Sequence, residues 1–315
     1  MRLVIPKDAC YNAVILTGTH GADMTLQKIP NIFKNKERSL SFEFFPPKTD
    51  KGYQNLLTTL EGLTAFDPDF ISCTYGAGGG NREKTFEIVE LIQKEHQITG
   101  LAHLTCVLNT KEEILAILHD IQNRGILNVL ALRGDPPLDN PGWTPGPDNF
   151  HYSYQLCRDI REHFKDTFGI GVAGFPEGHI LCPDKKKDAE YLKMKIDNGA
   201  DFVITQLFLD NQYYFDYLKR LRAIGVTARI IPGVLPITDY DKVERFCQND
   251  GITIPEEFKK IFVPLRENKE KTLDEGIKFT TRQCRELLDG DAPGLHFYTL
   301  NRPHPVDEIL RQIKK

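Results

Sequence analysis

SFEFFPPK, residues 41–48, places one acid in an otherwise apolar strand and ends that strand with two prolines. Successive side chains of a strand face opposite ways, so Glu43 is expected on the interior face, away from Phe42 and Phe44. A carboxyl group beside aromatic surface loses hydration, which disfavours its charged form and keeps a proton available near neutral pH. The segment therefore predicts either a general acid or a strand-end glutamate that reaches solvent or pairs with a lysine.

Seven more apolar runs follow this one, with amphipathic helical segments among them. This alternation predicts parallel strands joined by helical crossovers. The predicted strands are 40–45, 70–75, 101–107, 129–132, 170–175, 202–207, 229–232 and 294–300. The predicted helices are 81–93, 111–121, 154–164, 187–197, 212–224, 240–247, 269–288 and 305–313. The count is that of an α/β (β/α)8 TIM barrel, although an open doubly wound sheet of the same units is compatible with it.

The chain divides into an N-terminal extension, residues 1–38, and a single barrel domain, residues 39–315. The extension has no strong periodic pattern and is expected to cover the barrel bottom or to meet a partner. Residues 135–149 hold five prolines and the single tryptophan between the fourth strand and its helix. A loop of this length at the top of a barrel is usually a lid or a binding loop.

Composition narrows the classes of function. A net charge of -4 and a pI near 6.2 argue against nucleic-acid or anionic-membrane partners, which need basic stripes. The seven cysteines include no CxxC pair, so neither a disulfide framework nor a cluster site is expected, and a reducing cytoplasm suits them. We find no targeting or membrane-spanning segment.

A barrel enzyme carries its active site at the C-terminal ends of the strands. The polar residues expected there are Glu43, Thr74, Tyr75, His103, Thr105, Arg133, Asp135, Gln206, His296 and Arg302. The two histidines are either part of the site or hydrogen-bonded interior residues. None of these histidines and acids has the i, i+4 spacing of metal ligands on a helix, so no catalytic metal is predicted. The glycine run at 76–80 either lets the backbone approach a cofactor or packs as a loop.

Seven stretches, in order, closely resemble the methylenetetrahydrofolate reductase family. They are SFEFFPPK (41–48), TYGAGG (74–79), HLTC (103–106), LRGDPP (132–137), GADFVITQLFLD (199–210), IPGVLPI (231–237) and FYTLNR (297–302). The resemblance implies an FAD-containing barrel that reduces 5,10-methylenetetrahydrofolate to 5-methyltetrahydrofolate. NADH or NADPH would reduce the flavin first, and the two substrates would bind in turn by a ping-pong mechanism.

The resemblance also implies roles for single residues. Glu43 matches the general acid that protonates the folate so that its five-membered ring opens to an iminium. Asp135 matches the second catalytic acid, between flavin and folate. The implied FAD contacts are Thr74, Tyr75, Ala77, His103, Arg133, Gly134, Asp135, Tyr152, Phe175, His179, Asp188 and Lys195. The implied folate contacts are Glu43, Asp135, Gln206, Phe246 and Arg302.

Two positions depart from the bacterial pattern. Met194 stands where many bacterial members have a second basic residue, and Lys242 replaces a glutamine near the folate. The sequence ends directly after the eighth predicted helix, so inhibition by S-adenosylmethionine is not expected. The resemblance is compatible with a homo-oligomer and with an iron–sulfur electron-transfer subunit, whose clusters would have to come from another chain.

Two other functions fit part of the pattern. A folate-barrel methyltransferase that serves a corrinoid protein explains the barrel but not the flavin-like loop at 74–79. A non-catalytic flavin- or folate-binding subunit of a larger complex leaves the joint presence of Glu43, Asp135 and Gln206 unexplained.

Overall fold

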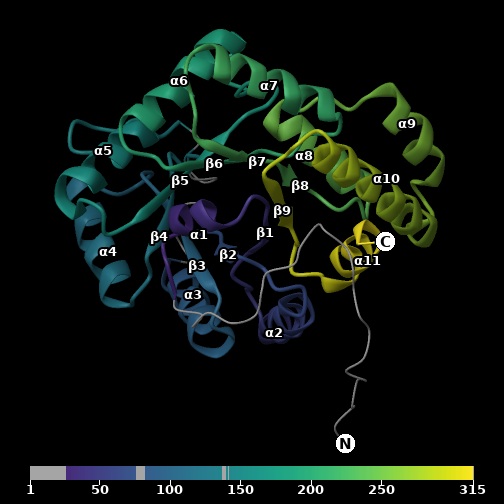
Figure 1. Ribbon diagram of the computed structural model, residues 1–315, viewed down its shortest axis with the longest axis horizontal. Helices are drawn as coiled ribbons and strands as arrows, with labels where there is room; N and C mark the ends of the chain where they lie inside the picture. Colours follow the sequence, from purple (N-terminus) through teal and green to yellow (C-terminus); the bar gives the residue numbers. More distant parts are fainter. Residues whose placement is uncertain (1–25, 76–81, 137–139, 141, 315) are drawn as a thin grey trace, which may run out of the picture.

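The computed structural model describes residues 26–75, 82–136, 140 and 142–314. Its strands are β1 (Ser39–Phe44), β2 (Phe70–Cys73), β3 (Thr99–Thr105), β4 (Asn128–Leu132), β5 (Gly169–Gly174), β6 (Phe202–Thr205), β7 (Arg229–Ile231), β8 (Gly233–Val234) and β9 (Gly294–Tyr298). They form one parallel sheet in the order β7-β6-β5-β4-β3-β2-β1-β9-β8, curled into a barrel (Figure 1). An open doubly wound sheet reverses its strand order at a switch point, and this order has no such reversal. The predicted TIM barrel is therefore confirmed.

The barrel closes at a break in its seventh strand. Pro232 separates β7 from β8, so a second short strand follows the one that the sequence predicted over 229–232. Proline has no N–H for a ladder, but its carbonyl oxygen accepts a 3.0 Å hydrogen bond from the backbone nitrogen of His296. Because β7 pairs with β6 and β8 pairs with β9, the chain itself joins the two edges of the sheet through Pro232.

Helices surround the strands (Figure 1). They are α1 (Ile29–Asn35), α2 (Asp50–Thr64), α3 (Arg82–His96), α4 (Lys111–Asn123), α5 (Ser153–Phe164), α6 (Lys185–Asp197), α7 (Asn211–Ala223), α8 (Tyr240–Asp250), α9 (Glu256–Phe262), α10 (Lys269–Asp289) and α11 (Pro303–Ile313), with the 3₁₀ helix η2 (Val263–Leu265). The eight predicted helices all appear within three residues of their expected ends.

Three helices, α1, α2 and α9, were not predicted. In α2 the Thr49 side chain accepts a hydrogen bond from the Gly52 nitrogen and begins the helix, and a buried stripe runs through Leu56, Leu60 and Leu63. The glycines and threonines of this segment have low helix propensity, so its local pattern is weak. Burial of the leucine stripe against the barrel stabilises α2 all the same.

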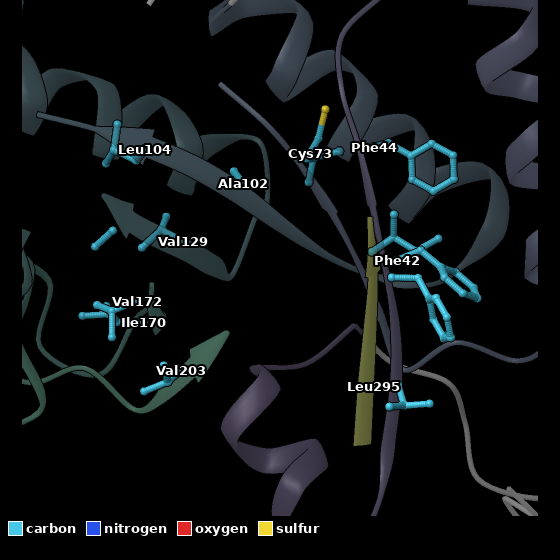
Figure 2. Close-up of a cluster of buried hydrophobic side chains, with 14 of the residues drawn as sticks. Phe42, Phe44, Cys73, Ala102, Leu104, Val129, Ile170, Val172, Val203 and Leu295 are labelled. Atoms are coloured by element: carbon cyan, nitrogen blue, oxygen red, sulfur yellow. The ribbon is translucent and has the colours of Figure 1, made fainter. Parts of the chain in front are cut away.

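The main hydrophobic core lies between the outer face of the strands and the helices. Figure 2 shows side chains of several strands gathered there, among them Phe42 and Phe44. Both rings are fully buried, which contributes about 1.5–3 kcal/mol for each. Because β1 sends these two rings outward, Ser41 and Glu43 face the barrel interior.

Helix α1 covers the N-terminal end of the barrel and lies in the middle of the ring in Figure 1. Its Ile29, Ile32 and Phe33 pack on interior side chains near the starts of the strands, such as Phe202. The Arg229 guanidinium lies 4.6 Å from the centre of the Phe33 ring. The described part of the N-terminal extension thus covers the barrel bottom, one of its two expected roles, while residues 1–25 lie outside the described residues.

Asn128 connects α1 to the sheet. This fully buried residue begins β4, and its Oδ1 accepts a 2.8 Å hydrogen bond from the Ile29 nitrogen. Its Nδ2 donates to the carbonyl oxygens of Gln27 and Gly100, both at 3.2 Å. One side chain therefore satisfies three backbone groups at the barrel bottom.

Replacing Asn128 with alanine should lower the free energy of unfolding by about 2–4 kcal/mol, because it leaves buried backbone groups without partners. Urea denaturation measures the change. Asn35→Ala, on the exposed side of α1, should change stability by no more than about 0.5 kcal/mol. Equal effects of the two substitutions would contradict the role of Asn128.

Candidate active site

Glu43 lies near the C-terminal end of β1, on the interior face that the alternation predicted. Its Oε2 atom is 3.4 Å from His103 Nε2 and 3.7 Å from His296 Nε2, and its side chain is 18% exposed. The sequence predicted aromatic surface beside this carboxyl group. The rings that adjoin it are the two imidazoles and the phenol of Tyr298, while Phe42 and Phe44 pack on the opposite face of the strand.

His103 projects from β3 into the interior and is almost fully buried. Burial lowers its pKa to about 4, opposed in part by the Glu43 carboxylate and reinforced by His296. The imidazole is therefore neutral at neutral pH. A neutral imidazole has one donor and one acceptor nitrogen, so His103 can adapt to either protonation state of the carboxyl group beside it.

His296 lies on β9, next to β1. Its Nδ1 is 2.8 Å from the Ser41 hydroxyl, and its ring stacks on Phe70 with a centroid distance of 6.0 Å. These contacts fix the ring so that Nε2 points to Glu43. The sequence left open whether His103 and His296 are site residues, and the structure brings both to the acid.

Four buried polar atoms that face the upper interior of the barrel have no hydrogen-bond partner among the described residues. They are Ser72 Oγ, His103 Nε2, Thr105 Oγ1 and His296 Nε2. Buried polar groups in native proteins are nearly always paired with protein, water or ligand. The upper interior of the barrel therefore presents polar atoms to whatever occupies it.

The Arg133–Gly134–Asp135 turn follows β4 directly. Gly134 has φ of +82°, and a β-carbon there would lie 2.8 Å from Val107 Cγ1 and 2.9 Å from the Thr105 β-carbon. Only glycine fits this position without strain. Asp135 is exposed, and the Arg133 Nε donates a 3.3 Å hydrogen bond to the Gly134 carbonyl oxygen.

A cavity of about 310 Å³ opens beside this turn and is lined in part by Trp143, Thr144 and Pro145 of the proline-rich segment. Arg133 and Gly134 line one part of it, and Trp143 and Tyr152 line another. The Tyr152 ring is 57% exposed and stacks on Tyr154 at 6.0 Å. The cavity combines aromatic surface with a guanidinium group, which suits a flat, anionic ligand.

Lys195 and three of the other implied cofactor contacts lie together near the end of β5. The Lys195 ammonium donates to the Ala173 carbonyl oxygen at 2.9 Å and lies 5.7 Å from the Phe175 ring centre. Burial lowers the pKa of Lys195 and raises that of Asp188. Asp188 accepts a 3.2 Å bond from the His179 nitrogen, and burial, helped by nearby cations, lowers the His179 pKa.

The segment after β2 is described only in part. Thr74 is half-buried, and its backbone nitrogen donates to the Phe44 carbonyl oxygen at 2.9 Å. Tyr75 is 2% exposed and packs on Phe86 of α3, and burial raises its pKa to about 12. Its ring thus belongs to the outer core. Ala77 and the glycine run lie outside the described residues.

The implied folate contacts occupy separate elements. Gln206 follows β6 and is half-buried, with its Oε1 accepting a 2.8 Å bond from the Leu207 nitrogen. Phe246 of α8 is half-buried against a second hydrophobic cluster. Arg302 is exposed at the start of α11. Of the two departures, Lys242 lies half-buried in the first turn of α8, and Met194 is 36% exposed on α6.

Sequence reasoning missed one residue beside the acid. Tyr298 is the register partner of Glu43 on β9, and two residues earlier His296 is the partner of Ser41. His296 and Tyr298 are two residues apart in the last strand, so their side chains lie on one face, and this spacing could have identified Tyr298 as an interior residue. What the sequence does not show is the pairing of the last strand with the first in this register.

The low pKa of His103 predicts a pH-dependent contribution to stability. The unfolded state takes up a proton near pH 6.5 and the native state only near pH 4, so stability falls as pH falls through this window. Between pH 7 and pH 5 the loss amounts to about 2 kcal/mol.

Urea denaturation at the two pH values measures this loss, and comparison with His103→Asn isolates it from other titrations. The variant should lose about 2 kcal/mol less than the wild type over the same interval. An unchanged pH dependence in the variant would rule out a depressed His103 pKa.

No set of three or more His, Cys, Asp or Glu side chains among the described residues is placed to hold a metal ion. Within the same residues, no helix has both the length and the apolar character needed to cross a membrane.

Comparison with known proteins identifies the family. The family model described as methylenetetrahydrofolate reductase matches residues 28–314. Methylenetetrahydrofolate reductase 1 of Schizosaccharomyces pombe is 38% identical over 87% of this chain and 45% of its own length. The 5,10-methylenetetrahydrofolate reductase of Salmonella typhimurium is 33% identical, over 84% of this chain and 86% of its own.

The chain spans about half the length of the first fungal and plant relatives. A solved structure supports the fold alone, with a TM-score of 0.62 at 14% identity over 90% of this chain and 96% of the other. It is an uncharacterized protein from Clostridium thermocellum that binds two copies of 5-methyl-5,6,7,8-tetrahydrofolic acid. The family match covers the barrel from α1 to α11, and the chain belongs to the methylenetetrahydrofolate reductase family.

Proposed function

We propose that this protein is an FAD-dependent enzyme that reduces 5,10-methylenetetrahydrofolate to 5-methyltetrahydrofolate with electrons from a reduced nicotinamide dinucleotide. The observation that carries the proposal is the Glu43 carboxyl group, held inside the barrel mouth between two imidazoles in a chain of this family. The names of relatives give NADH for Arabidopsis thaliana and NADPH for Caenorhabditis elegans, so both donors belong in the test.

The residues at the mouth fit FAD. Gly134 leaves room where a β-carbon would collide, and the adjoining cavity has aromatic and cationic walls. The Lys195 ammonium, close to Arg133 and Asp188, is suited to a pyrophosphate. The residues that would hold FAD are Thr74, His103, Arg133, Gly134, Asp135, Tyr152, Phe175, His179, Asp188 and Lys195. When bound, FAD supplies hydride transfer from the nicotinamide to the folate.

Glu43 donates the proton that opens the folate ring. Its Oε atoms face the interior, where a substrate nitrogen at the mouth can reach them. His103, neutral and buried, presents Nε2 to the carboxyl group and adds no positive charge that would favour its ionised form. His296 is held by Ser41 and supports the other side of the same group. A general acid of this kind contributes about 10²–10⁴-fold to rate.

Asp135, Gln206, Phe246 and Arg302 bind the folate in this proposal. Asp135 and Arg302 are exposed and able to meet polar parts of an incoming ligand, whereas Phe246 offers a half-buried ring for stacking. The Gln206 amide can donate or accept, so it can serve folate and nicotinamide alike. One shared site requires the two substrates to bind in turn, which gives ping-pong kinetics.

Substitution of Glu43 by glutamine should separate the two half-reactions. Anaerobic NADH or NADPH should still bleach the absorbance of the bound flavin, because that reaction needs no acid. Reduction of 5,10-methylenetetrahydrofolate should fall by about 10²–10⁴-fold. Stopped-flow absorbance measures both, with Glu257→Gln, an exposed side chain paired with Lys260, as the control. Equal loss of both half-reactions would contradict the role of Glu43, and a wild-type chain that never binds flavin would overturn the proposed function.

Substitution of Lys195 by methionine should reduce FAD binding by about tenfold or more, because it removes a partly buried cation from the proposed pyrophosphate site. The ratio of flavin to protein absorbance after reconstitution and gel filtration gives the measurement. Lys193→Met is the matched control on the same helix, where the ammonium pairs with Asp197 at 2.6 Å. FAD binding that is the same in the two variants would exclude Lys195 from the cofactor site.

A further inference from the structure

The barrel seam consists of Thr205 of β6, Gly233 of β8 and Tyr298 of β9, and side-chain hydrogen bonds join β6 to β8 and β9 there, past the end of the β6–β7 ladder. The register between β6 and β7 ends at the pair Ile204 and Ile231, one residue before Thr205. Beyond that pair the Gly233 nitrogen donates to the Thr205 hydroxyl at 3.0 Å. The Tyr298 hydroxyl donates to the Thr205 carbonyl oxygen at 2.6 Å. These two bonds join the strands on either side of the break at Pro232.

Tyr298 reaches Thr205 across Gly233. A β-carbon on Gly233 would collide with the Thr205 carbonyl oxygen and with the Tyr298 hydroxyl. Glycine at this position therefore leaves the space through which the phenol passes. The hydroxyl then satisfies a backbone carbonyl that lies past the end of the β6–β7 register.

The bond fixes the peptide unit that leads into Gln206. The carbonyl oxygen of this unit belongs to Thr205 and accepts from Tyr298, while its N–H belongs to Gln206 and donates to the Gly174 carbonyl oxygen at 2.7 Å. One peptide is thus held from β5 on one side and from β9 on the other. Without the phenol hydroxyl, only the bond to β5 would hold it.

The same tyrosine adjoins the acid side of the site. Tyr298 is the register partner of Glu43 on the neighbouring strand, and its ring meets that of His296 edge-on at 5.5 Å. It also packs on the second hydrophobic cluster, against which Phe246 packs and which contains Leu207. Tyr298 therefore contacts both walls of the mouth, that of Glu43 and that of Gln206.

We propose that Tyr298 is a positioning residue, whose bond to the Thr205 carbonyl oxygen sets the place of Gln206 relative to Glu43. No atom of Tyr298 has to touch the substrate for this role. The inference rests on the proposed function for its substrate, because Gln206 and Glu43 are expected to contact the same folate. The bond itself and its effect on the Gln206 backbone do not depend on that function.

The first measurement is hydrogen exchange of the backbone amides in the flavin-loaded full chain. Tyr298→Phe keeps the ring and removes only the hydroxyl, so the Gln206 and Gly233 amides should exchange about tenfold faster. Tyr214→Phe is the matched control, because the buried Tyr214 hydroxyl also donates to a strand carbonyl, that of Ile230, at 2.8 Å. It should leave the Gln206 and Gly233 amides unchanged. Unchanged exchange in Tyr298→Phe would overturn the proposal.

The second measurement is calorimetric binding of 5-methyltetrahydrofolate to the wild type, Tyr298→Phe, Gln206→Ala and the double variant. Tyr298→Phe should weaken binding by about tenfold in the wild-type background and by less than about twofold in the Gln206→Ala background. A merely structural tyrosine would give independent, additive effects, and that result would overturn the positioning role. A wild-type chain that does not bind the folate contradicts the proposed function and the folate role of Tyr298 together, while the exchange result still decides whether the bond orders Gln206.

Discussion

Burial of Phe42 and Phe44 fixes the position of the acid. Both rings lie in the core between strands and helices, and each contributes about 1.5–3 kcal/mol through burial. A one-residue slip of β1 would move both rings into the interior and turn Glu43 toward the helices, so the outer core enforces the register. The site therefore obtains a carboxyl group at a fixed depth from an ordinary packing constraint. Burying a carboxyl group inside the barrel costs desolvation free energy, and the favourable burial of apolar side chains in the rest of the barrel offsets it.

The barrel interior is apolar at the bottom and polar near the mouth. At the bottom, α1 and apolar side chains such as Phe70 and Phe202 exclude water. Directly above Phe70 lies His296, whose ring stacks on it. The apolar floor thus lies next to the imidazoles and contributes to the burial that keeps His103 neutral. Helix α1 packs on this apolar floor from below and so helps to keep water from it.

Local sequence pattern predicted the strands, most helices and the inward direction of Glu43, because alternation and helical periodicity depend on near neighbours. It placed His103 and His296 among the candidate site residues but did not predict that both adjoin Glu43. They come from strands 60 and more than 250 residues away, and their approach depends on register. It also missed α2, whose leucine stripe only becomes decisive when packed. The break at Pro232 was read as a strand end, and the role of Tyr298 across it follows from a pairing between distant parts of the chain.

The order of the strands places the charged and polar side chains at different positions around the barrel mouth. Lys195 lies near Ala173 of β5, and Arg133 follows β4. His103 lies on β3, and Glu43 and Tyr298 lie on β1 and β9, further along the same strand order. The Lys195 ammonium and the Arg133 guanidinium stand at one side and the Glu43 carboxyl group at the other, with the neutral imidazole of His103 between them. Because attraction between opposite charges weakens with distance, these cations attract a nearby anion more strongly than they attract the more distant Glu43 carboxylate. This separation of the cations from the carboxyl group depends on an unbroken ladder from β5 to β9, and the seam at Pro232 lies outside that arc.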